Sequence, residues 1–339
     1  MSLPLPLVDS FNRSVNYMRV SVTDRCNLRC TYCMPAYGVN WMKQDHILSF
    51  DEFYRIIERA VLRGLKKIRL TGGEPLVRSG IVEFVAKVAA LKEKGLKDLA
   101  MTTNAVLLKS MAEPLYKAGL RRLNISLDSL HPKRFEEVTR GNCFRKVWEG
   151  IEEAERAGFN PIKINMVLQK GCNDDEVIDF VKMTLNRNIH VRFIEYMPCG
   201  DYDDWKLKYM PMDDVMKRIE AEFGKLEQNL EDKGGNEGTS GPAYNFRLPG
   251  AKGVVGFIHA ISDHFCDTCN RVRLTADGSI RPCLFSDIEV NFREALRRNC
   301  SDEELDDLFD QALQIKPEGH MLEQFAEEKT LKSMISIGG

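Results

Sequence analysis

The first two thirds of the chain alternate between short apolar runs and longer amphipathic stretches. Six runs have the length and composition of buried strands that end in polar residues: 17–24, 66–72, 98–104, 121–128, 161–168 and 190–197. The stretch 50–64 places apolar residues at positions 53, 56, 57, 60 and 61, which is a helical spacing. The stretches 79–94, 106–118, 145–157 and 174–187 follow the same rule and predict further helices.

Six strand-then-helix units in succession predict a parallel sheet with helices packed against it. An open doubly wound sheet and a full or partial barrel both fit this order. Both architectures place ligands at the carboxyl ends of the strands. Polar residues gather at these ends: Asp24, Thr71, Gly72, Gly73, Glu74, Thr102, Thr103, Asn104, Ser126, Asp128 and Glu195. We therefore expect the functional site there.

The alternation stops near residue 225, which predicts two parts, 1–225 and 226–339. Residues 227–243 are polar and rich in glycine, as in a mobile loop or linker. A short β-like region, 244–283, and helices within 288–315 follow.

Composition narrows the function classes. The chain has 339 residues, 43% of them hydrophobic, and a formal net charge of −2, so it can bury a large core but carries no global field for nucleic acid or anionic membranes. No apolar run approaches the roughly 20 residues of a spanning helix, and the first residues do not resemble a signal peptide. We expect a cytoplasmic protein, in which ten cysteines favour metal binding or catalysis over disulfides.

Three cysteines follow the first predicted strand at a C-x3-C-x2-C spacing: Cys26, Cys30 and Cys33. Three thiolates can hold three irons of a [4Fe–4S] cluster and leave the fourth iron open to another ligand. The alternative is a zinc site completed by His46, although this spacing is unusual for zinc.

A second triplet occupies the C-terminal part: Cys266, Cys269 and Cys283. His264 could complete a zinc site here. Arg271 and Arg273 alternate along a strand-like run, so both point to one face, where two guanidinium groups beside a metal suit a polyphosphate. The alternative is a pair of solvated arginines. The remaining cysteines, Cys143, Cys172, Cys199 and Cys300, are scattered and read as ordinary thiols.

These motifs carry a family resemblance. The first triplet, with Tyr32 before its last cysteine, and the segment TGGEP at 71–75 resemble the signatures of radical S-adenosylmethionine (SAM) enzymes. RVSVTDRCNLRCTYCM, MTTNAVLL, LYKAGLRRLNISLDSL, RFIEYM, FCDTCNRVRLTADG and the final GG together resemble the GTP 3′,8-cyclases of molybdenum cofactor biosynthesis. The resemblance implies a partial (β/α)6 barrel of the TIM type with a C-terminal extension that carries a second iron–sulfur cluster.

The resemblance also implies an activity. A 5′-deoxyadenosyl radical would take the hydrogen from ribose C3′ of GTP, and C3′ would attack C8 of guanine to give 3′,8-cyclo-7,8-dihydro-GTP. The implied cofactors are two [4Fe–4S] clusters and SAM. The implied partners are GTP, a reductant protein and a downstream cyclic pyranopterin monophosphate synthase, with no nucleic acid or membrane, for a monomer or homodimer.

Residue roles follow from the same resemblance. Cys26, Cys30 and Cys33 would hold the SAM cluster, and Cys266, Cys269 and Cys283 the second cluster. SAM would contact Tyr32, Gly73, Glu74, Ser126 and Met197. GTP would contact Arg19, Arg69, Thr102, Lys163, Arg192, Arg271 and Arg273. The terminal Gly338 and Gly339 would enter the active site and assist catalysis together with Arg271 and Arg273.

Two other functions remain as alternatives. The first is a radical SAM enzyme that modifies a peptide or cofactor, a class that usually carries more cysteines in its C-terminal extension. The second is a zinc-stapled nucleotide-binding protein without redox chemistry, which would be colourless where an iron–sulfur protein is brown.

Overall fold

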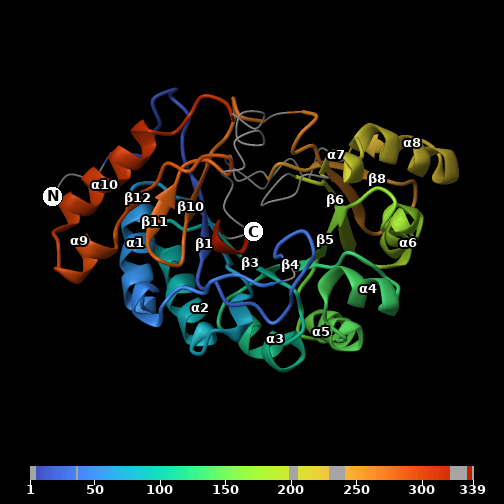
Figure 1. Ribbon diagram of the computed structural model, residues 1–339, viewed down its shortest axis with the longest axis horizontal. Helices are drawn as coiled ribbons and strands as arrows, with labels where there is room; N and C mark the ends of the chain where they lie inside the picture. Colours follow the sequence, from blue (N-terminus) through green and yellow to red (C-terminus); the bar gives the residue numbers. More distant parts are fainter. Residues whose placement is uncertain are drawn as a thin grey trace.

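The computed structural model describes residues 5–35, 37–197, 205–228, 241–263, 265–320 and 334–337. Its centre is one sheet of twelve strands in the order β12-β11-β10-β1-β2-β3-β4-β5-β6-β9-β8-β7. Figure 1 shows the sheet curving around an interior, with helices along its outer side. The order ends at β12 and β7 rather than returning on itself, so the barrel is partial.

The middle of the sheet consists of the six units expected from the sequence. The strands are β1 (Tyr17–Ser21), β2 (Lys67–Thr71), β3 (Asp98–Thr103), β4 (Arg122–Ser126), β5 (Ile162–Leu168) and β6 (Ile189–Glu195). The helices between them are α1 (Phe50–Leu62), α2 (Ile81–Ala89), α3 (Leu108–Lys117), α4 (Pro132–Thr139), α5 (Phe144–Arg156) and α6 (Val177–Asn186). All six strands pair in parallel with their sequence neighbours, which confirms the barrel and excludes a doubly wound order.

The C-terminal part adds strands to both edges. On one side β10 (Arg271–Leu274) pairs in parallel with β1 and is followed by β11 (Ser279–Arg281) and β12 (Val290–Asn291). On the other side β9 (Val254–Ile258) pairs in parallel with β6 and is followed by β8 (Tyr244–Arg247) and β7 (Glu227–Gln228). The sheet is therefore continuous across residue 225, where the sequence pattern changes.

The remaining α-helices of the described residues all follow β6 in the chain. They are α7 (Trp205–Lys208), α8 (Met212–Phe223), α9 (Arg293–Arg297), α10 (Asp302–Gln314) and α12 (Met334–Ile337). Helix α10 packs against α1, where Arg59 and Asp306 form an ion pair. Most of the predicted linker 227–243 lies outside the described residues, as do Gly338, Gly339, His264 and Cys199.

The core lies between the outer face of the sheet and the helices. Alternate strand residues, such as Val20 on β1 and Leu70 on β2, are fully buried and pack against helix residues such as Phe53 and Ile56. Each fully buried side chain of this size contributes about 1.5–3 kcal/mol. Because side chains alternate along a strand, the residues between these apolar positions face the interior of the barrel.

Candidate active site

The inner face of the parallel strands carries a row of cations. Arg19 on β1 pairs in register with Arg273 on β10 and with Arg69 on β2, so the three side chains share one face of the sheet. One step toward the start of the strands, Tyr17 pairs with Arg271 and Lys67. Period-two alternation in neighbouring parallel strands therefore collects these guanidinium and ammonium groups in the barrel interior.

The other predicted GTP residues join the same face across the sheet. Asn124 on β4 pairs with Thr102 on β3 and with Lys163 on β5, and Asn165 pairs with Arg192 on β6. Lys163 is 4% exposed and Arg192 is 7% exposed, which excludes the solvent-facing alternative for Lys163. All seven residues predicted to contact GTP thus lie on one continuous inner surface.

The electrostatics of this surface favour an anion. Burial, together with repulsion from Arg273, Arg69 and Arg271, holds the pKa of Arg19 well below its usual value. Although burial raises the pKa of Tyr17, the cations around it, Arg69 first, lower that pKa to about 8. A buried group of cations that repel one another gains stability when a polyanion enters.

Unsatisfied polar atoms point to the same conclusion. Nε of Arg69, Nε of Arg271 and Oγ1 of Thr102 are buried without a hydrogen-bond partner among the described residues. Leaving such a buried donor unpaired costs about 1–3 kcal/mol. Hydrogen bonds to a bound ligand would recover that cost.

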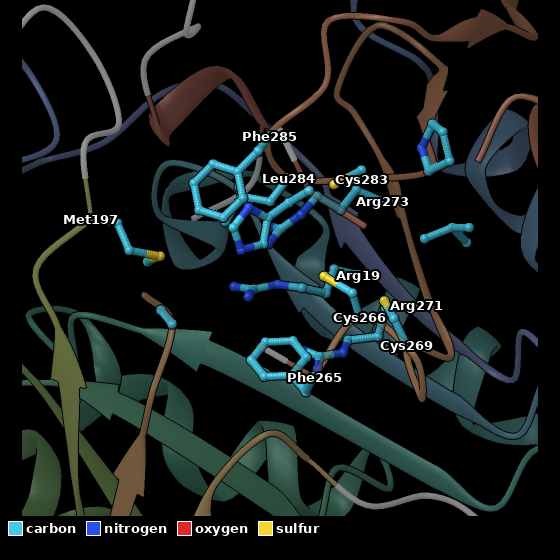
Figure 2. Close-up of a pocket in the computed structure, with 14 residues that line it drawn as sticks. Arg19, Met197, Phe265, Cys266, Cys269, Arg271, Arg273, Cys283, Leu284 and Phe285 are labelled. Carbon is cyan, nitrogen blue, oxygen red and sulfur yellow. The ribbon is translucent and has the colours of Figure 1, made fainter. Parts of the chain in front are cut away.

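A cavity, with about 660 Å³ of empty space that is partly open to solvent, connects this surface to the second cysteine triplet. It is lined by Arg19, Arg271, Arg273 and the three cysteines, together with Met197, Phe265, Phe285 and His320 among others. In Figure 2, Met197 lies on the other side of the cavity from Cys266, Cys269 and Cys283.

The fold brings the second triplet together from two loops. Cys266 and Cys269 precede β10 in a tight turn, in which the Cys269 N–H donates to the Cys266 carbonyl at 3.0 Å. Cys283 follows β11, which is antiparallel to β10. Burial raises the pKa of the Cys283 thiol, and the neighbouring Cys269 and Cys266 raise it further, so the three sulfurs lie within electrostatic range of one another. For Cys269, burial is outweighed by Arg271, Lys316 and Arg13, and its pKa is lowered.

The first triplet lies in the loop after β1. Hydrogen bonds from the Arg29 and Thr31 N–H groups to the Thr139 and Val138 carbonyls tie this loop to the end of α4. Burial raises the pKa of Cys30 well above its usual value, with added repulsion from Asp128, Cys33 and Cys26. The Tyr32 hydroxyl donates to Asp128 at 2.8 Å, which fixes the ring between the last two cysteines.

The TGGEP segment packs directly against the chain that leads into this triplet. A Cβ atom on Gly73 would lie 2.3 Å from the Arg25 carbonyl oxygen, and one on Gly72 would lie 2.5 Å from the Thr23 carbonyl oxygen. The Gly73 and Glu74 N–H groups donate to the Thr23 and Arg25 carbonyls, each at 2.8 Å. The glycines thus allow two loops to touch at the carboxyl ends of β1 and β2.

Glu74 lies behind this contact and is only 1% exposed. Its carboxylate accepts hydrogen bonds from the Leu76 N–H, the Thr103 hydroxyl and the Asn104 N–H at 3.0, 2.8 and 2.6 Å. Burial is the larger effect and raises its pKa to about 7. The Asn104 side chain in turn donates to the Cys26 sulfur at 3.8 Å, so the glycine motif and the first triplet are mechanically connected.

Both triplets fit iron–sulfur clusters by the chemistry of their donors, three clustered thiols each. The described residues contain no group of three His, Cys, Asp or Glu side chains placed to hold a single metal ion, as the zinc alternatives require. His46 is exposed in a short 3-10 helix, and His264 lies outside the described residues. In a [4Fe–4S] cluster each thiolate binds a different iron, so the three sulfurs need not meet at one ion.

Sequence reasoning missed three residues of the site: Tyr17, Lys67 and Arg122. Lys67 contacts the Tyr17 ring at 4.9 Å and pairs with Asp98 at 3.3 Å, and Arg122 pairs with the same carboxylate at 2.6 Å. Tyr17 and Lys67 are each two residues from a predicted ligand on the same strand, so strict period-two alternation would have found them. Asn104 was expected at the strand ends, but its contact with Cys26 had no sequence signal because it joins separate loops.

Comparisons with known proteins agree with this architecture. The family model of the radical SAM superfamily matches residues 20–184, and that described as Molybdenum Cofactor Synthesis C matches residues 189–322. A GTP 3′,8-cyclase of Heliobacterium modesticaldum is 48% identical over 335 residues, which are 98% of this chain and 100% of that one. A GTP 3′,8-cyclase of Listeria welshimeri is 46% identical over 340 residues, 98% of this chain and 99% of that one.

A solved structure confirms the fold. Streptococcus suis SuiB bound to S-adenosylmethionine has a TM-score of 0.60 at 17% identity, covering 91% of this chain and 67% of that one. Within the described residues, no helix has the length and apolar character needed to cross a membrane.

Proposed function

The chain belongs to the GTP 3′,8-cyclase family of radical SAM enzymes. We propose that its two cysteine triplets and the cationic surface each perform a separate part of the reaction of this family. The enzyme converts GTP to 3′,8-cyclo-7,8-dihydro-GTP, the first step of molybdenum cofactor biosynthesis, and uses SAM and an iron–sulfur cluster. One observation carries the assignment of residues: Arg19, Arg271 and Arg273 line one cavity with Cys266, Cys269 and Cys283.

Cys26, Cys30 and Cys33 are proposed to hold the cluster that binds SAM. When bound, that cluster and SAM supply the electron and the 5′-deoxyadenosyl radical that removes hydrogen from C3′ of GTP. The Tyr32–Asp128 hydrogen bond keeps the cysteine loop against the barrel. Gly73, Ser126 at the end of β4, and Met197 at the cavity are proposed to border SAM.

Glu74 is proposed to act on SAM indirectly. Both of its carboxylate oxygens accept hydrogen bonds from the chain itself. Its role is to fix the loop after β3 and the backbone of the glycine motif, so that their N–H and carbonyl groups can face the ligand.

The inner cations are proposed to hold the triphosphate of GTP. The triphosphate carries close to four negative charges. Donors on one continuous inner surface of the sheet can meet them: Arg19, Arg69, Thr102, Lys163, Arg192, Arg271 and Arg273. Arginine can bind phosphate oxygens in pairs and so fix the direction of the nucleotide. Because misplacing a reacting atom by about 1 Å can cost on the order of a hundredfold in rate, this orientation is the main catalytic task of the protein groups.

Cys266, Cys269 and Cys283 are proposed to hold a second [4Fe–4S] cluster, whose open iron would bind the guanine base. The cavity that these cysteines share with Arg271 and Arg273 supports this placement, since the base and the phosphates belong to one molecule. Gly338 and Gly339, which lie outside the described residues, are proposed to complete the site.

The setting of the enzyme is proposed on the family resemblance. It comprises a reductant protein, a downstream cyclic pyranopterin monophosphate synthase, a cytoplasmic location and a monomeric or homodimeric state. We also keep the division into 1–225 and 226–339 as a proposal, with the second cluster in the later part.

Anaerobic reconstitution tests these assignments. Two clusters predict about eight irons per chain, because each holds four. With SAM, dithionite and GTP, 5′-deoxyadenosine should form only when GTP is present, together with a product of the same mass as GTP. Replacing Cys266, Cys269 and Cys283 by Ala should halve the iron and abolish the product. A triple variant that retains all its iron would refute the second cluster.

A further inference from the structure

Two segments from opposite ends of the chain meet behind the second cysteine triplet. Residues 7–15 form a tight loop, in which the Val15 N–H donates to the Leu7 carbonyl at 2.8 Å and the Asp9 N–H to the Arg13 carbonyl at 3.1 Å. Residues 316–318 follow α10 and lie beside this loop. Figure 1 shows the blue start of the chain next to the red segment beyond α10. The first of these segments carries no sequence motif.

Asp9 lies where the two segments meet, between Arg13 and Lys316. Its carboxylate is fully buried, and Oδ1 accepts hydrogen bonds from the Phe11 and Arg13 N–H groups, both at 3.0 Å. Oδ2 accepts from Nε of Arg13 at 2.7 Å and lies 3.3 Å from Nζ of Lys316. One buried carboxylate thus orients two cations from opposite ends of the chain.

Both cations reach the backbone of the cysteine turn. Arg13 Nη1 donates to the Cys266 carbonyl at 2.7 Å, and Lys316 Nζ donates to the Cys269 carbonyl at 3.1 Å. The guanidinium also donates to the Pro317 and Glu318 carbonyls, each at 2.6 Å, and so links the N-terminal loop to the segment after α10. The charged donors therefore hold the turn in addition to its own hydrogen bond from the Cys269 N–H to the Cys266 carbonyl.

The shell leaves net positive charge beside the sulfurs. The charge of Asp9 neutralises one of the two cations, which leaves one net positive charge. Because Lys316 is only 3% exposed, water screens that charge weakly. Each cation lies one hydrogen bond from the backbone of a cysteine in the turn, Arg13 from Cys266 and Lys316 from Cys269. In an iron–sulfur site, nearby positive charge stabilises the more reduced cluster and raises its reduction potential.

We propose that Asp9, Arg13 and Lys316 form a positioning shell for the metal group bound by Cys266, Cys269 and Cys283, which fixes the cysteine turn and raises the reduction potential of that group. The proposal rests on the second cluster proposed above. It concerns residues that touch neither GTP nor the cysteine sulfurs. The shell acts on the reaction only through the turn and its charge.

The test compares Lys316→Met with Lys316→Arg in reconstituted full-length enzyme. Lys316→Met removes the donor and the charge, and should make the ratio of reduced to oxidised second cluster about tenfold smaller at a fixed potential, a shift of about 59 mV for one electron. Lys316→Arg keeps both and should restore the wild-type potential. The readouts are an electron paramagnetic resonance redox titration and the rate of iron release to a chelator.

Arg13→Lys tests the positioning of the cysteine turn separately from the charge beside it. It also serves as the test variant if Lys316→Met does not fold. Lysine keeps the charge but cannot make the four contacts of the guanidinium fork. Iron release from the second cluster should then be several-fold faster at a nearly unchanged potential. An unchanged release rate would refute the positioning role.

Arg63→Met is the matched control. Arg63 is also 3% exposed and also joins the two ends of the chain, through the Leu5 carbonyl, Asp306 and Asp310, but it contacts no cysteine. Arg63→Met should lower the melting temperature of the enzyme without changing the reduction potential of the second cluster. If Arg63→Met shifts the potential as much as Lys316→Met does, the shell is only structural.

The cysteine-to-alanine triple variant separates the two proposals. If it keeps all its iron, the second cluster is wrong, and the shell is wrong with it. If it loses half its iron while Lys316→Met matches the wild type in potential and iron release, the shell alone is refuted.

Discussion

The contact between Gly73 and the chain before the first triplet gives a quantitative prediction. In Gly73→Ala the new Cβ would lie 2.3 Å from the Arg25 carbonyl oxygen, 2.6 Å from its carbon and 2.7 Å from the Asp24 carbonyl oxygen. Real Cβ contacts are essentially never shorter than 3.0 Å, so the two loops must separate by at least 0.7 Å, which is 3.0 minus 2.3. Every close atom is backbone, so no side chain can rotate away.

The residue that must move is next to Cys26. A displacement of this size at a cluster ligand should lower the turnover number by roughly a hundredfold, the scale expected for misplacing reacting groups by about 1 Å. Overpacking should also cost about 1–3 kcal/mol of stability. Because Gly73 does not have a positive φ, the loss comes from the contact and not from backbone strain.

The assay is GTP-dependent formation of 5′-deoxyadenosine by reconstituted enzyme, with the affinity for SAM and the iron content measured on the same sample. Gly241→Ala is the control, because a Cβ there meets nothing within 4 Å. A Gly73→Ala enzyme with turnover and SAM affinity within twofold of the wild type would refute the reasoning.

Three further predictions follow from the site. Arg273→Ala should weaken GTP binding at least about tenfold, the loss of one charged hydrogen-bonding partner, while the iron content stays constant; normal GTP affinity by calorimetry would remove Arg273 from the phosphate site. Cys30→Ala should abolish SAM cleavage and lower the iron content by up to half, measured by 5′-deoxyadenosine and iron assays; retained cleavage would exclude Cys30 as a ligand. Burial raises the pKa of Glu74 to about 7, above its unfolded value near 4.5. The protonated carboxyl therefore stabilises the folded state fully below pH 4.5, and this stabilisation is lost as the pH rises toward 7. The free energy of unfolding should fall by on the order of 3 kcal/mol across that window. Glu74→Gln should flatten the dependence of the melting temperature on pH in that window, and an unchanged slope would contradict the raised pKa.

The sequence predicted the barrel because each of its strands is defined locally. Val20 and Leu70 alternate with Arg19 and Arg69, and the helix that begins at Phe50 carries a capping box between Ser49 and Glu52. Such signals lie within a few residues of one another, so they can be read without knowing the fold. The helix Pro132–Thr139 was missed, because it is short and its apolar face is narrow.

Parts of the site lacked a local signal. The pairing of β1 with β10 joins positions that are far apart in the chain, and only this register brings Arg19 beside Arg273. The contacts of Asp9 with Lys316 and of Asn104 with Cys26 are likewise set by tertiary packing. Motif spacing located the cysteines, but it could not locate the groups that support them.

The pairing of β1 with β10 also constrains how the enzyme is made. Tyr17 is among the first residues to leave the ribosome, and its partner Arg271 follows 254 positions later, the difference of the two residue numbers. The other edge of the six-strand core, β6, is covered earlier by β9 (Val254–Ile258), but β1 stays an open edge until β10 is made. Such edges promote aggregation of unfinished chains. Premature release at any point before β10 therefore leaves a chain with an exposed edge and an incomplete cavity. The last strands to be synthesised protect the first.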